Sequence, residues 1–351
     1  NPRVDHGGPP PRVTELDPIS ATEWLPGQVL LDKYQIMQRI GAGGMGVVHA
    51  ARRLDLGDVV AIKSVLPERS SAGNRQRFLR EARALARIRH PNVVRVFDFG
   101  EAEGRPFMVM EYLDGPTLAK VIAKSRLPLA RSLAIFHDIC RAVEAGHRRG
   151  VVHRDLKPGN VMFDRSDDGG ETVKVLDFGL AQLAGDDSEH SQVGLMVGTC
   201  GYMSPEQIEQ GAGGAASDVF SLGVMLYELV VGERPFEAGS QVATLMHICE
   251  GEYPPPRERV PELPDAVVEA IVAALQHDPA ARPSSALALA ERALGRTHEA
   301  PPPPDPGDSL VVQREVGTQA SPLPITRGFT DEATEAVRRP PRPELGSSDG
   351  S

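Results

Sequence analysis

Cysteine is scarce in this chain of 351 residues, which carries only Cys140, Cys200 and Cys249. Their number is odd, they are widely spaced, and no Cys-x-x-Cys pair occurs. The sequence therefore offers neither a disulfide framework nor a structural zinc site. This cysteine usage is typical of a reducing compartment, and we expect a cytoplasmic location.

Long apolar runs are also lacking, because none reaches the roughly 18 residues that a membrane helix needs. The best candidate, Leu222–Val231, is interrupted by Gly223 and Glu228, and we interpret it as a buried core helix. We expect no membrane segment in this chain. The sequence starts at Asn1 without methionine, which suggests a fragment or processed form, so an anchor elsewhere in the gene product stays open.

Positive charge is in deficit, with a formal net charge of -10. An acidic chain is a poor candidate for sequence-independent binding to a nucleic acid backbone, so we expect no nucleic acid partner. Hydrophobic residues make up 40% and charged residues 25%, which suits a globular protein of one large or two modest domains. No internal repeat is visible.

The composition divides the chain into three parts. Residues 1–27 and 298–351 are rich in proline and poor in apolar side chains, and we predict a disordered leader and a disordered tail. Residues 28–297 form the predicted folded domain, of class α+β. Its first lobe, about 28–112, reads as a small antiparallel β-rich unit with one helix, and its second, about 113–297, as mostly helical.

The predicted elements follow from hydrophobic periodicity. Strands are expected at Tyr34–Ile40, Val47–Arg53, Val59–Val65, Val93–Gly100 and Phe107–Glu111, with a helix at Gln76–Arg89. In the second lobe, short strands are expected near Val151–Val152, Val161–Phe163 and Val173–Leu176. A cleft between two such lobes is a common place for a ligand.

A glycine-rich run, Gly41–Val48, has the pattern Gly-x-Gly-x-x-Gly-x-Val. Glycines allow backbone amides to approach phosphate oxygens closely. A dinucleotide-binding loop would need a helix after the last glycine, but the residues after Gly46 are strand-like. A Walker loop would need Gly-Lys-Ser/Thr, which is absent. A strand-loop-strand phosphate cover is favoured, with an ordinary hairpin turn as the alternative.

Lys63 lies among apolar residues of a predicted strand, where alternation places it on the same face as Ala61. A buried ammonium needs an anionic partner. Glu81 lies on the apolar side of the following helix, in phase with Phe78 and Leu85, and we predict that it pairs with Lys63. The alternative is an exposed glutamate. The opposite, arginine-rich face of this helix is interpreted as solvated.

Two short motifs carry the predicted chemistry: residues 153–160, His-Arg-Asp-Leu-Lys-Pro-Gly-Asn, and residues 177–179, Asp-Phe-Gly. Asp155 is placed to orient a hydroxyl and accept its proton, and Lys157 to stabilise charge on a transferring phosphate. Asn160 and Asp177 supply oxygen ligands suited to magnesium. His153 is predicted to pack against Phe178 rather than to act in catalysis. Asp-Phe-Gly alone could be a surface turn, but the combined motifs argue against coincidence.

With these motifs in place, the chain resembles the protein kinase family over about residues 28–297, and in particular the eukaryotic-like serine/threonine kinases of bacteria. Further matching segments are residues 90–92 (His-Pro-Asn), 198–206 (through Ser-Pro-Glu), 217–223, 232–236 and 282–283. The resemblance implies a bilobal kinase fold that binds ATP with Mg²⁺, or Mn²⁺ as an alternative metal. Lys157 is typical of serine/threonine enzymes.

The resemblance also implies a set of site residues. Catalytic roles fall to Asp155, Lys157, Lys63 and Glu81, and metal binding to Asn160 and Asp177. The nucleotide would contact Ile40, Gly41, Ala42, Gly43, Gly44, Met45, Gly46, Val48, Ala61, Lys63, Met110, Glu111, Leu113 and Met162. Glu206 and Arg282 would form a buried ion pair, and Asp218 would anchor the catalytic loop.

Regulation is expected in the segment between Asp177 and Glu206. Ser191 is the main predicted phosphorylation site, with Ser188 and Thr199 as further candidates, and a phosphate there could pair with Arg154. Expected partners are ATP, protein substrates and a transient second copy for autophosphorylation. Two alternatives remain: a catalytically weak ATP-binding scaffold, and a small-molecule phosphotransferase of related fold. The first is weakened by the retention of Lys63, Glu81, Asp155, Asn160 and Asp177, and the second by the His-Pro-Asn and Ser-Pro-Glu segments.

Overall fold

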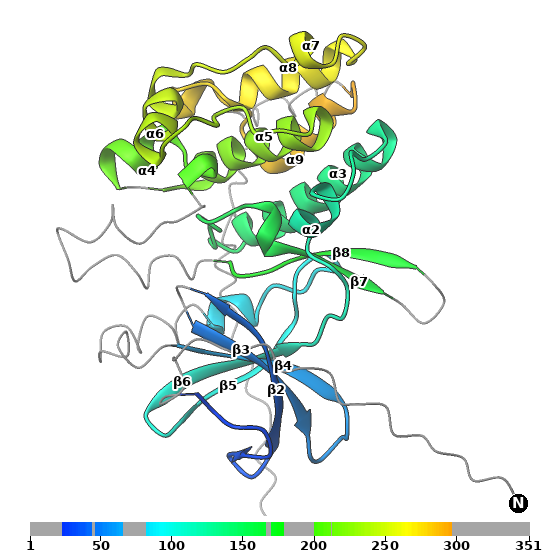
Figure 1. The fold of residues 1–351 in the computed structure, drawn as a ribbon, viewed down its shortest axis with the longest axis vertical. Coiled ribbons are helices and arrows are strands. Elements are labelled where there is room, and N and C mark those ends of the chain that lie inside the picture. Colours follow the sequence, from blue (N-terminus) through cyan, green and yellow to red (C-terminus); the bar gives the residue numbers. More distant parts are fainter. Residues whose placement is uncertain are drawn as a thin grey trace, which may run out of the picture. The chain divides into compact units, whose positions relative to one another are not determined.

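The computed structural model describes residues 23–43, 46–65, 82–165, 170–178, 200–211 and 213–296 (Figure 1). Residues 1–22 of the predicted leader and the whole predicted tail, 298–351, therefore lie outside the described residues. Within them, a β-sheet lobe is followed by a mostly helical lobe, as the sequence predicts.

The first lobe is a six-stranded sheet with the order β1-β2-β3-β4-β6-β5, and every neighbouring pair is antiparallel. Its strands are β1 (Val29–Leu30), β2 (Tyr34–Gly43), β3 (Gly46–Arg53), β4 (Val59–Val65), β5 (Val96–Ala102) and β6 (Arg105–Glu111). The β3–β4 and β5–β6 turns contain Gly57 and Gly104, both at positive φ, which glycine adopts without strain. Of the predicted helix, residues 82–89 are described, and it is helical over 82–85 only, so it ends before the predicted end at Arg89.

One strand starts later than predicted. The predicted strand begins at Val93, but β5 begins at Val96. Val93 instead forms a parallel bridge with Val175, and the backbone N–H of Val94 donates to the Val175 carbonyl at 3.0 Å. Val93 and Val94 are therefore paired with the second lobe, whereas the Arg95 carbonyl accepts the Glu111 N–H of β6 at 2.9 Å.

The second lobe contains helices and one two-stranded hairpin. The helices are α2 (Leu118–Ile122), α3 (Leu129–His147), α4 (Pro205–Gln210), α5 (Ala215–Val231), α6 (Gln241–Glu250), α7 (Pro256–Arg259), α8 (Asp265–Ala274) and α9 (Ala286–Ala293). The hairpin pairs β7 (Val161–Arg165) with β8 (Glu171–Val175). The strand expected at Val151–Val152 is wrong, because the Val151 N–H instead caps the end of α3 through the Gly146 carbonyl at 3.0 Å.

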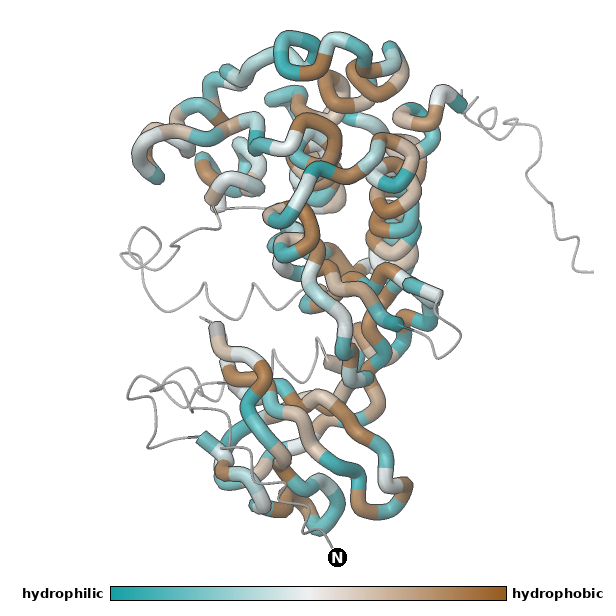
Figure 2. Tube along the Cα trace, turned by 45° about the vertical axis from the view of Figure 1, so that its right-hand side comes forward, coloured by the Kyte–Doolittle hydropathy of each residue, from teal (hydrophilic) through white to brown (hydrophobic). Residues whose placement is uncertain are grey.

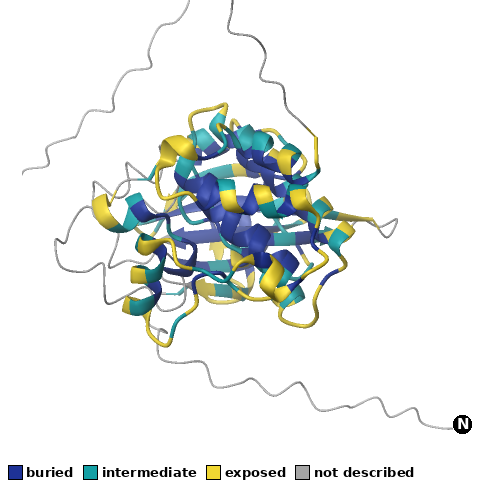
Figure 3. Ribbon diagram, turned by 90° about the horizontal axis from the view of Figure 1, so that it is seen from above, coloured by how far each residue is buried: buried dark blue, intermediate teal, exposed yellow. Residues whose placement is uncertain are grey.

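Helix α5 is the buried centre of this lobe, which confirms the interpretation of Leu222–Val231 as a core helix. Figure 3 shows it in dark blue among more exposed elements. A Cβ atom at Gly223 would lie 2.6 Å from the Ala274 Cβ, so glycine is required for the close packing of α5 against α8. Among the described residues, no helix is both long enough and apolar enough to cross a bilayer.

Two hydrophobic cores form, and Figure 2 shows the apolar residues recurring along strands and central helices. The larger core joins the helical lobe to one face of the sheet. The smaller core lies on the other face and includes Trp24, of which only 2% is exposed. The predicted folded domain starts at residue 28, but the packed segment begins earlier because the Trp24 side chain is buried in this core.

Candidate functional site

The glycine-rich run forms the hairpin between β2 and β3. The strands pair until Gly43 faces Gly46, and Gly41 faces Val48. This confirms the predicted strand-loop-strand arrangement and excludes the helix that a dinucleotide-binding loop requires. Gly44 and Met45, at its tip, lie outside the described residues.

Lys63 lies on β4 and reaches Asp177, which follows β8. The Lys63 Nζ is 2.7 Å from the Asp177 Oδ1, and the side chains are 10% and 24% exposed. Burial alone would raise the pKa of Asp177, but Lys63, together with His153 and Lys157, outweighs that effect and lowers it. Asp177 is therefore a carboxylate near neutral pH. Glu81, the predicted partner of Lys63, lies outside the described residues.

The loop before Asp155 is held by Asp218 of α5, whose side chain is fully buried. The backbone N–H groups of His153 and Arg154 each donate to one Asp218 oxygen at 2.8 Å. The His147 Nε2 lies 2.7 Å from Asp218 as well. Arg154 has φ of 65°, a left-handed conformation that is costly for a residue with a side chain. Asp218 therefore stabilises an unfavourable backbone geometry directly before Asp155.

The Asp155 side chain meets two other predicted site residues. The Lys157 Nζ lies 2.9 and 2.7 Å from its two oxygens. The Asn160 Nδ2 donates to the Asp155 carbonyl at 2.8 Å and to its carboxylate at 3.0 Å. The three residues thus form one hydrogen-bonded unit in which a carboxylate and a cation are partly open to solvent.

Asn160 and Asp177 are brought together by the backbone, since the Leu176 N–H donates to the Asn160 carbonyl at 2.9 Å. Asn160 contacts Asp155 through its side-chain nitrogen. Its side-chain oxygen, the atom that would bind a metal, takes no part in that contact. No cluster of three or more His, Cys, Asp or Glu side chains suited to a metal occurs in the described ranges. Two hard oxygen donors fit Mg²⁺, which takes its remaining ligands from phosphate and water.

The two loops are also joined by His153 and Phe178, as predicted. Their rings lie 4.8 Å apart, and the His153 Nε2 is 2.7 Å from the Leu176 carbonyl. Asp177, beside Phe178, has φ of 56°, so a second left-handed residue lies in the site. Strained backbone that is held by several contacts is a feature of functional loops.

The residues predicted to contact the adenine ring belong to one hydrophobic cluster. They come from β3, β4, β6, β7 and the segment after β6, and they are Val48, Ala61, Met110, Leu113 and Met162. Ala61 faces Met110 across the β4–β6 pair. Their contact with a nucleotide stays a prediction.

Glu111, at the end of β6, makes contacts that the sequence did not reveal. The Lys174 Nζ of β8 lies 2.9 and 3.0 Å from its two carboxylate oxygens. The backbone N–H of Arg95 donates to the same side chain at 2.7 Å. The connection between the lobes is thereby held by an ion pair of which the two side chains are 13% and 19% exposed.

The predicted ion pair between Glu206 and Arg282 is confirmed. The guanidinium makes two parallel bonds of 2.8 and 2.9 Å to the carboxylate, and Ser217 adds a third at 2.6 Å. Burial opposes the charged carboxylate, but Arg282 and Ser217 outweigh it and lower the Glu206 pKa to about 2. The pair fixes α4, which follows the segment proposed for regulation. Ser188, Ser191 and Thr199 of that segment lie outside the described residues.

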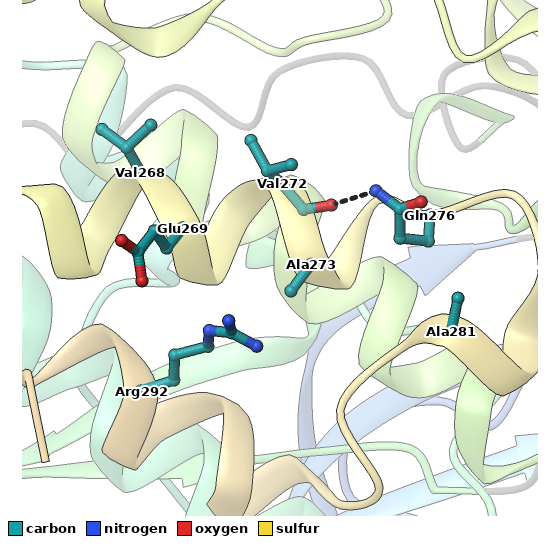
Figure 4. A pocket seen from close by; sticks show the side chains of 7 residues that line it. All are labelled: Val268, Glu269, Val272, Ala273, Gln276, Ala281 and Arg292. Atoms are coloured by element: carbon teal, nitrogen blue, oxygen red, sulfur yellow. Dashed lines mark hydrogen bonds between the residues drawn. The ribbon is translucent and has the colours of Figure 1, made fainter. Parts of the chain in front are cut away.

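A surface hollow lies elsewhere, between α8 and α9 (Figure 4). It is lined by Val268, Glu269, Val272, Ala273, Gln276, Ala281 and Arg292. The Gln276 side chain is bonded back to the Val272 carbonyl at 2.9 Å. None of these residues belongs to the predicted site, and we assign the hollow no part in its chemistry.

A bilobal fold with a glycine-rich hairpin, a lysine-aspartate pair and this loop defines a class of nucleotide-dependent phosphotransferases. Residues 34–294 match the family model described as "Protein kinase domain". The chain belongs to the protein kinase family, which uses ATP and a divalent metal.

Similar proteins point to one branch of that family. The chain is 36% identical, over 89% of its length, to the serine/threonine-protein kinase PknB of Mycolicibacterium smegmatis and covers 52% of it. It is 40% identical, over 75% of its length, to the serine/threonine-protein kinase pkn3 of Myxococcus xanthus and covers 50% of it. It thus spans about half the length of these curated relatives. A crystal structure of the Mycobacterium tuberculosis PknI kinase domain covers 78% of this chain, with a TM-score of 0.62, 25% identity and full coverage of its own chain.

Proposed function

We propose that this domain is an active protein kinase that transfers the γ-phosphate of ATP to serine and threonine hydroxyls of proteins. The observation that carries the proposal is the convergence of Lys63 and Asp177 beside the Asp155 unit. Phosphoryl transfer depends mainly on positioning and charge stabilisation, and these groups supply both. Homology to bacterial serine/threonine-protein kinases over most of the chain supports the same activity.

Each residue has a proposed role. Asp155 orients the substrate hydroxyl and accepts its proton as the oxygen attacks. Lys157, now bonded to Asp155, stabilises negative charge on the phosphate being transferred, and Lys63 binds the phosphates of ATP. Asn160 and Asp177 would hold Mg²⁺, which when bound neutralises phosphate charge. The apolar cluster around Ala61 and Met110 holds the adenine ring.

The proposal is tested by measuring phosphate transfer from labelled ATP to a serine- and threonine-containing protein such as myelin basic protein. Asp155→Asn keeps the side-chain shape but cannot accept the proton, so we expect transfer to fall by about 10²-fold or more. The matched control is Asp138→Asn, a partly exposed position on α3. Equal transfer by the wild type and Asp155→Asn would overturn the proposal and favour the ATP-binding scaffold.

Autophosphorylation is a second part of the proposal, with Ser191 as its main site and Ser188 and Thr199 as lesser ones. Mass spectrometry after incubation with Mg-ATP should find phosphate on Ser191, and Ser191→Ala should lower the transfer rate. If two copies modify each other, the initial rate per enzyme molecule rises with enzyme concentration. Phosphate confined to residues 1–22 and 297–351 would contradict this part.

A further inference from the structure

The face of the sheet opposite Val48 and Lys63 carries its own hydrophobic cluster, with Trp24 at its edge. The strand members of this cluster are Leu30, Tyr34, Ile36, Ala51, Val60, Ile62, Phe107 and Val109. In the described part of the chain, Trp24 is the member that lies outside the strands. Its ring meets that of Phe107 edge-on at 5.7 Å. Residues 23–28 thus pack against the edge of this face through Trp24, and we name them the N-terminal clamp.

Polar contacts hold the clamp at two ends. The Glu23 carboxylate lies 2.8 Å from Arg39 of β2. The Trp24 indole N–H donates to Glu103 at 3.2 Å, and the Gln28 side chain donates to the other oxygen of Glu103 at 2.8 Å. Glu103 lies in the β5–β6 turn. The clamp therefore connects β2, near one edge of the sheet, to the β5–β6 turn at the other edge.

His49 of β3 is the unusual residue beneath the clamp. It is 1% exposed, and its ring lies 6.1 Å from that of Trp24. Within the described ranges, neither of its ring nitrogens has a hydrogen-bond partner. Burial lowers the pKa of His49, Arg39 and Arg105 lower it further, and Glu23 opposes them. The docked clamp therefore accepts a neutral imidazole and disfavours an imidazolium, which would bury a charge and two N–H groups.

The strand under the clamp also forms the predicted nucleotide site. His49 faces Arg39 on β2 and Ile62 on β4. Its neighbour Val48 faces Lys63 and points to the opposite side of the sheet, because successive side chains alternate. The contact between Trp24 and His49 therefore lies on one face of β3, and Val48 lies on the other face.

We propose that Trp24 is a positioning residue, which acts through His49 to hold β3 in place behind the nucleotide site, and that this contact is stable only while His49 is uncharged. The direction of the pH dependence follows from the coupling between clamp docking and protonation of His49. When the clamp is released, His49 regains an ordinary pKa of about 6.5 and takes up a proton below that pH, which the docked state resists. Docking is therefore fully favoured above pH 6.5 and weakens as the pH falls. Between pH 7.5 and 5.5 the ratio of docked to released clamp should drop by up to about tenfold.

The test uses the fact that Trp24 is the only tryptophan of the chain. Labelling with ¹⁵N-tryptophan gives one indole N–H signal, whose exchange protection measures the opening of the clamp even when the released state is rare. We expect protection in the wild type, corrected for intrinsic exchange, to fall by up to about tenfold from pH 7.5 to 5.5. His49→Phe keeps an apolar ring of similar size and should show no such change.

Two controls keep the outcome specific. His247→Phe, on α6, should retain the wild-type pH dependence. Hydrogen exchange of the α5 backbone amides, measured by mass spectrometry, reports global unfolding. Its protection should not show the pH dependence of the indole N–H. The same pH dependence in His49→Phe as in the wild type, or pH-independent protection in the wild type, would overturn the proposal.

The proposed effect of Trp24 on the nucleotide site rests on the proposed function, and nucleotide affinity tests it separately. The affinity for a non-hydrolysable ATP analogue with Mg²⁺ should fall between pH 7.5 and 5.5 more steeply in the wild type than in His49→Phe. If the affinity falls equally with pH in the wild type and in His49→Phe, the positioning role is overturned, even if the indole signal changes. Absence of analogue binding at both pH values would instead contradict the proposed function, and the indole experiment separates the two failures.

Discussion

The ammonium of Lys63 lies 2.7 Å from a carboxylate oxygen of Asp177, so a single ion pair connects β4 of the sheet lobe to the end of the hairpin in the helical lobe. Both side chains are largely removed from solvent. The pair places the proposed phosphate-binding cation next to the proposed metal ligand, and phosphoryl transfer requires both groups at the triphosphate.

Replacing Lys63 by methionine should lower phosphate transfer by about 10²-fold, because a cation fixed at the phosphates is lost while side-chain volume is kept. The labelled-ATP assay measures the effect. Lys120→Met, at an exposed position of α2, is the control and should keep wild-type transfer. A Lys63→Met rate within a factor of about two of the wild type would contradict the assigned role.

Glu206 should make the stability of the domain depend on acidity. Its folded pKa is lowered to about 2 from an ordinary value of 4.5, so its contribution is complete above pH 4.5 and is lost as the pH falls towards 2. This contribution is on the order of 3 kcal/mol. Urea unfolding of the wild type and Glu206→Gln should therefore show a stability difference that shrinks across this range. A difference that is constant from pH 7 to 3 would argue against the pair.

Substitution of Asp218 tests the support of the catalytic loop. Asp218→Ala leaves the backbone N–H groups of His153 and Arg154 buried without acceptors, which should lower the free energy of unfolding by about 3 kcal/mol and reduce transfer. Asp218→Asn retains one carbonyl oxygen and should lose less of both. Urea unfolding and the transfer assay measure the two effects. Wild-type transfer by the alanine variant would show that the loop does not depend on this anchor.

The Lys174–Glu111 pair should influence nucleotide affinity. Among the described residues, Lys174→Met leaves the Glu111 side chain, next to the predicted adenine contacts, held by the Arg95 N–H alone. We expect the Kd for ATP to rise about fivefold, equivalent to about 1 kcal/mol. Isothermal titration calorimetry gives the value. Arg131→Met removes a more exposed ion pair with Glu171 of the same hairpin and should leave the Kd unchanged. Equal affinities for both variants would sink this prediction.

Local patterns in the sequence predicted much of this architecture. The apolar alternation around Lys63 gave β4 with its observed bounds, and the apolar run at Leu222–Val231 lies within the buried helix α5. The valine pair at 151–152 misled because the backbone there serves to end α3. Trp24 was missed because its surroundings are rich in proline and acidic residues, and composition alone cannot show that one large ring is buried.

Contacts between distant segments were harder to foresee. Lys174 lies on a strand with ordinary alternation, and nothing near it in sequence indicates that Glu111 is its partner. His147 likewise ends a helix and meets Asp218 only after folding. By contrast, motif resemblance predicted the Glu206–Arg282 pair, because both residues belong to recognisable segments.

The most direct test of the central claim, that the two loops converge on ATP with its metal, is the dependence of ATP affinity on Mg²⁺, measured by calorimetry. We expect Mg²⁺ to increase ATP affinity in the wild type and in the control Asp164→Asn, on the neighbouring strand β7, but not in Asp177→Asn. An Asp177→Asn protein whose ATP affinity responds to Mg²⁺ as strongly as that of the wild type would contradict it.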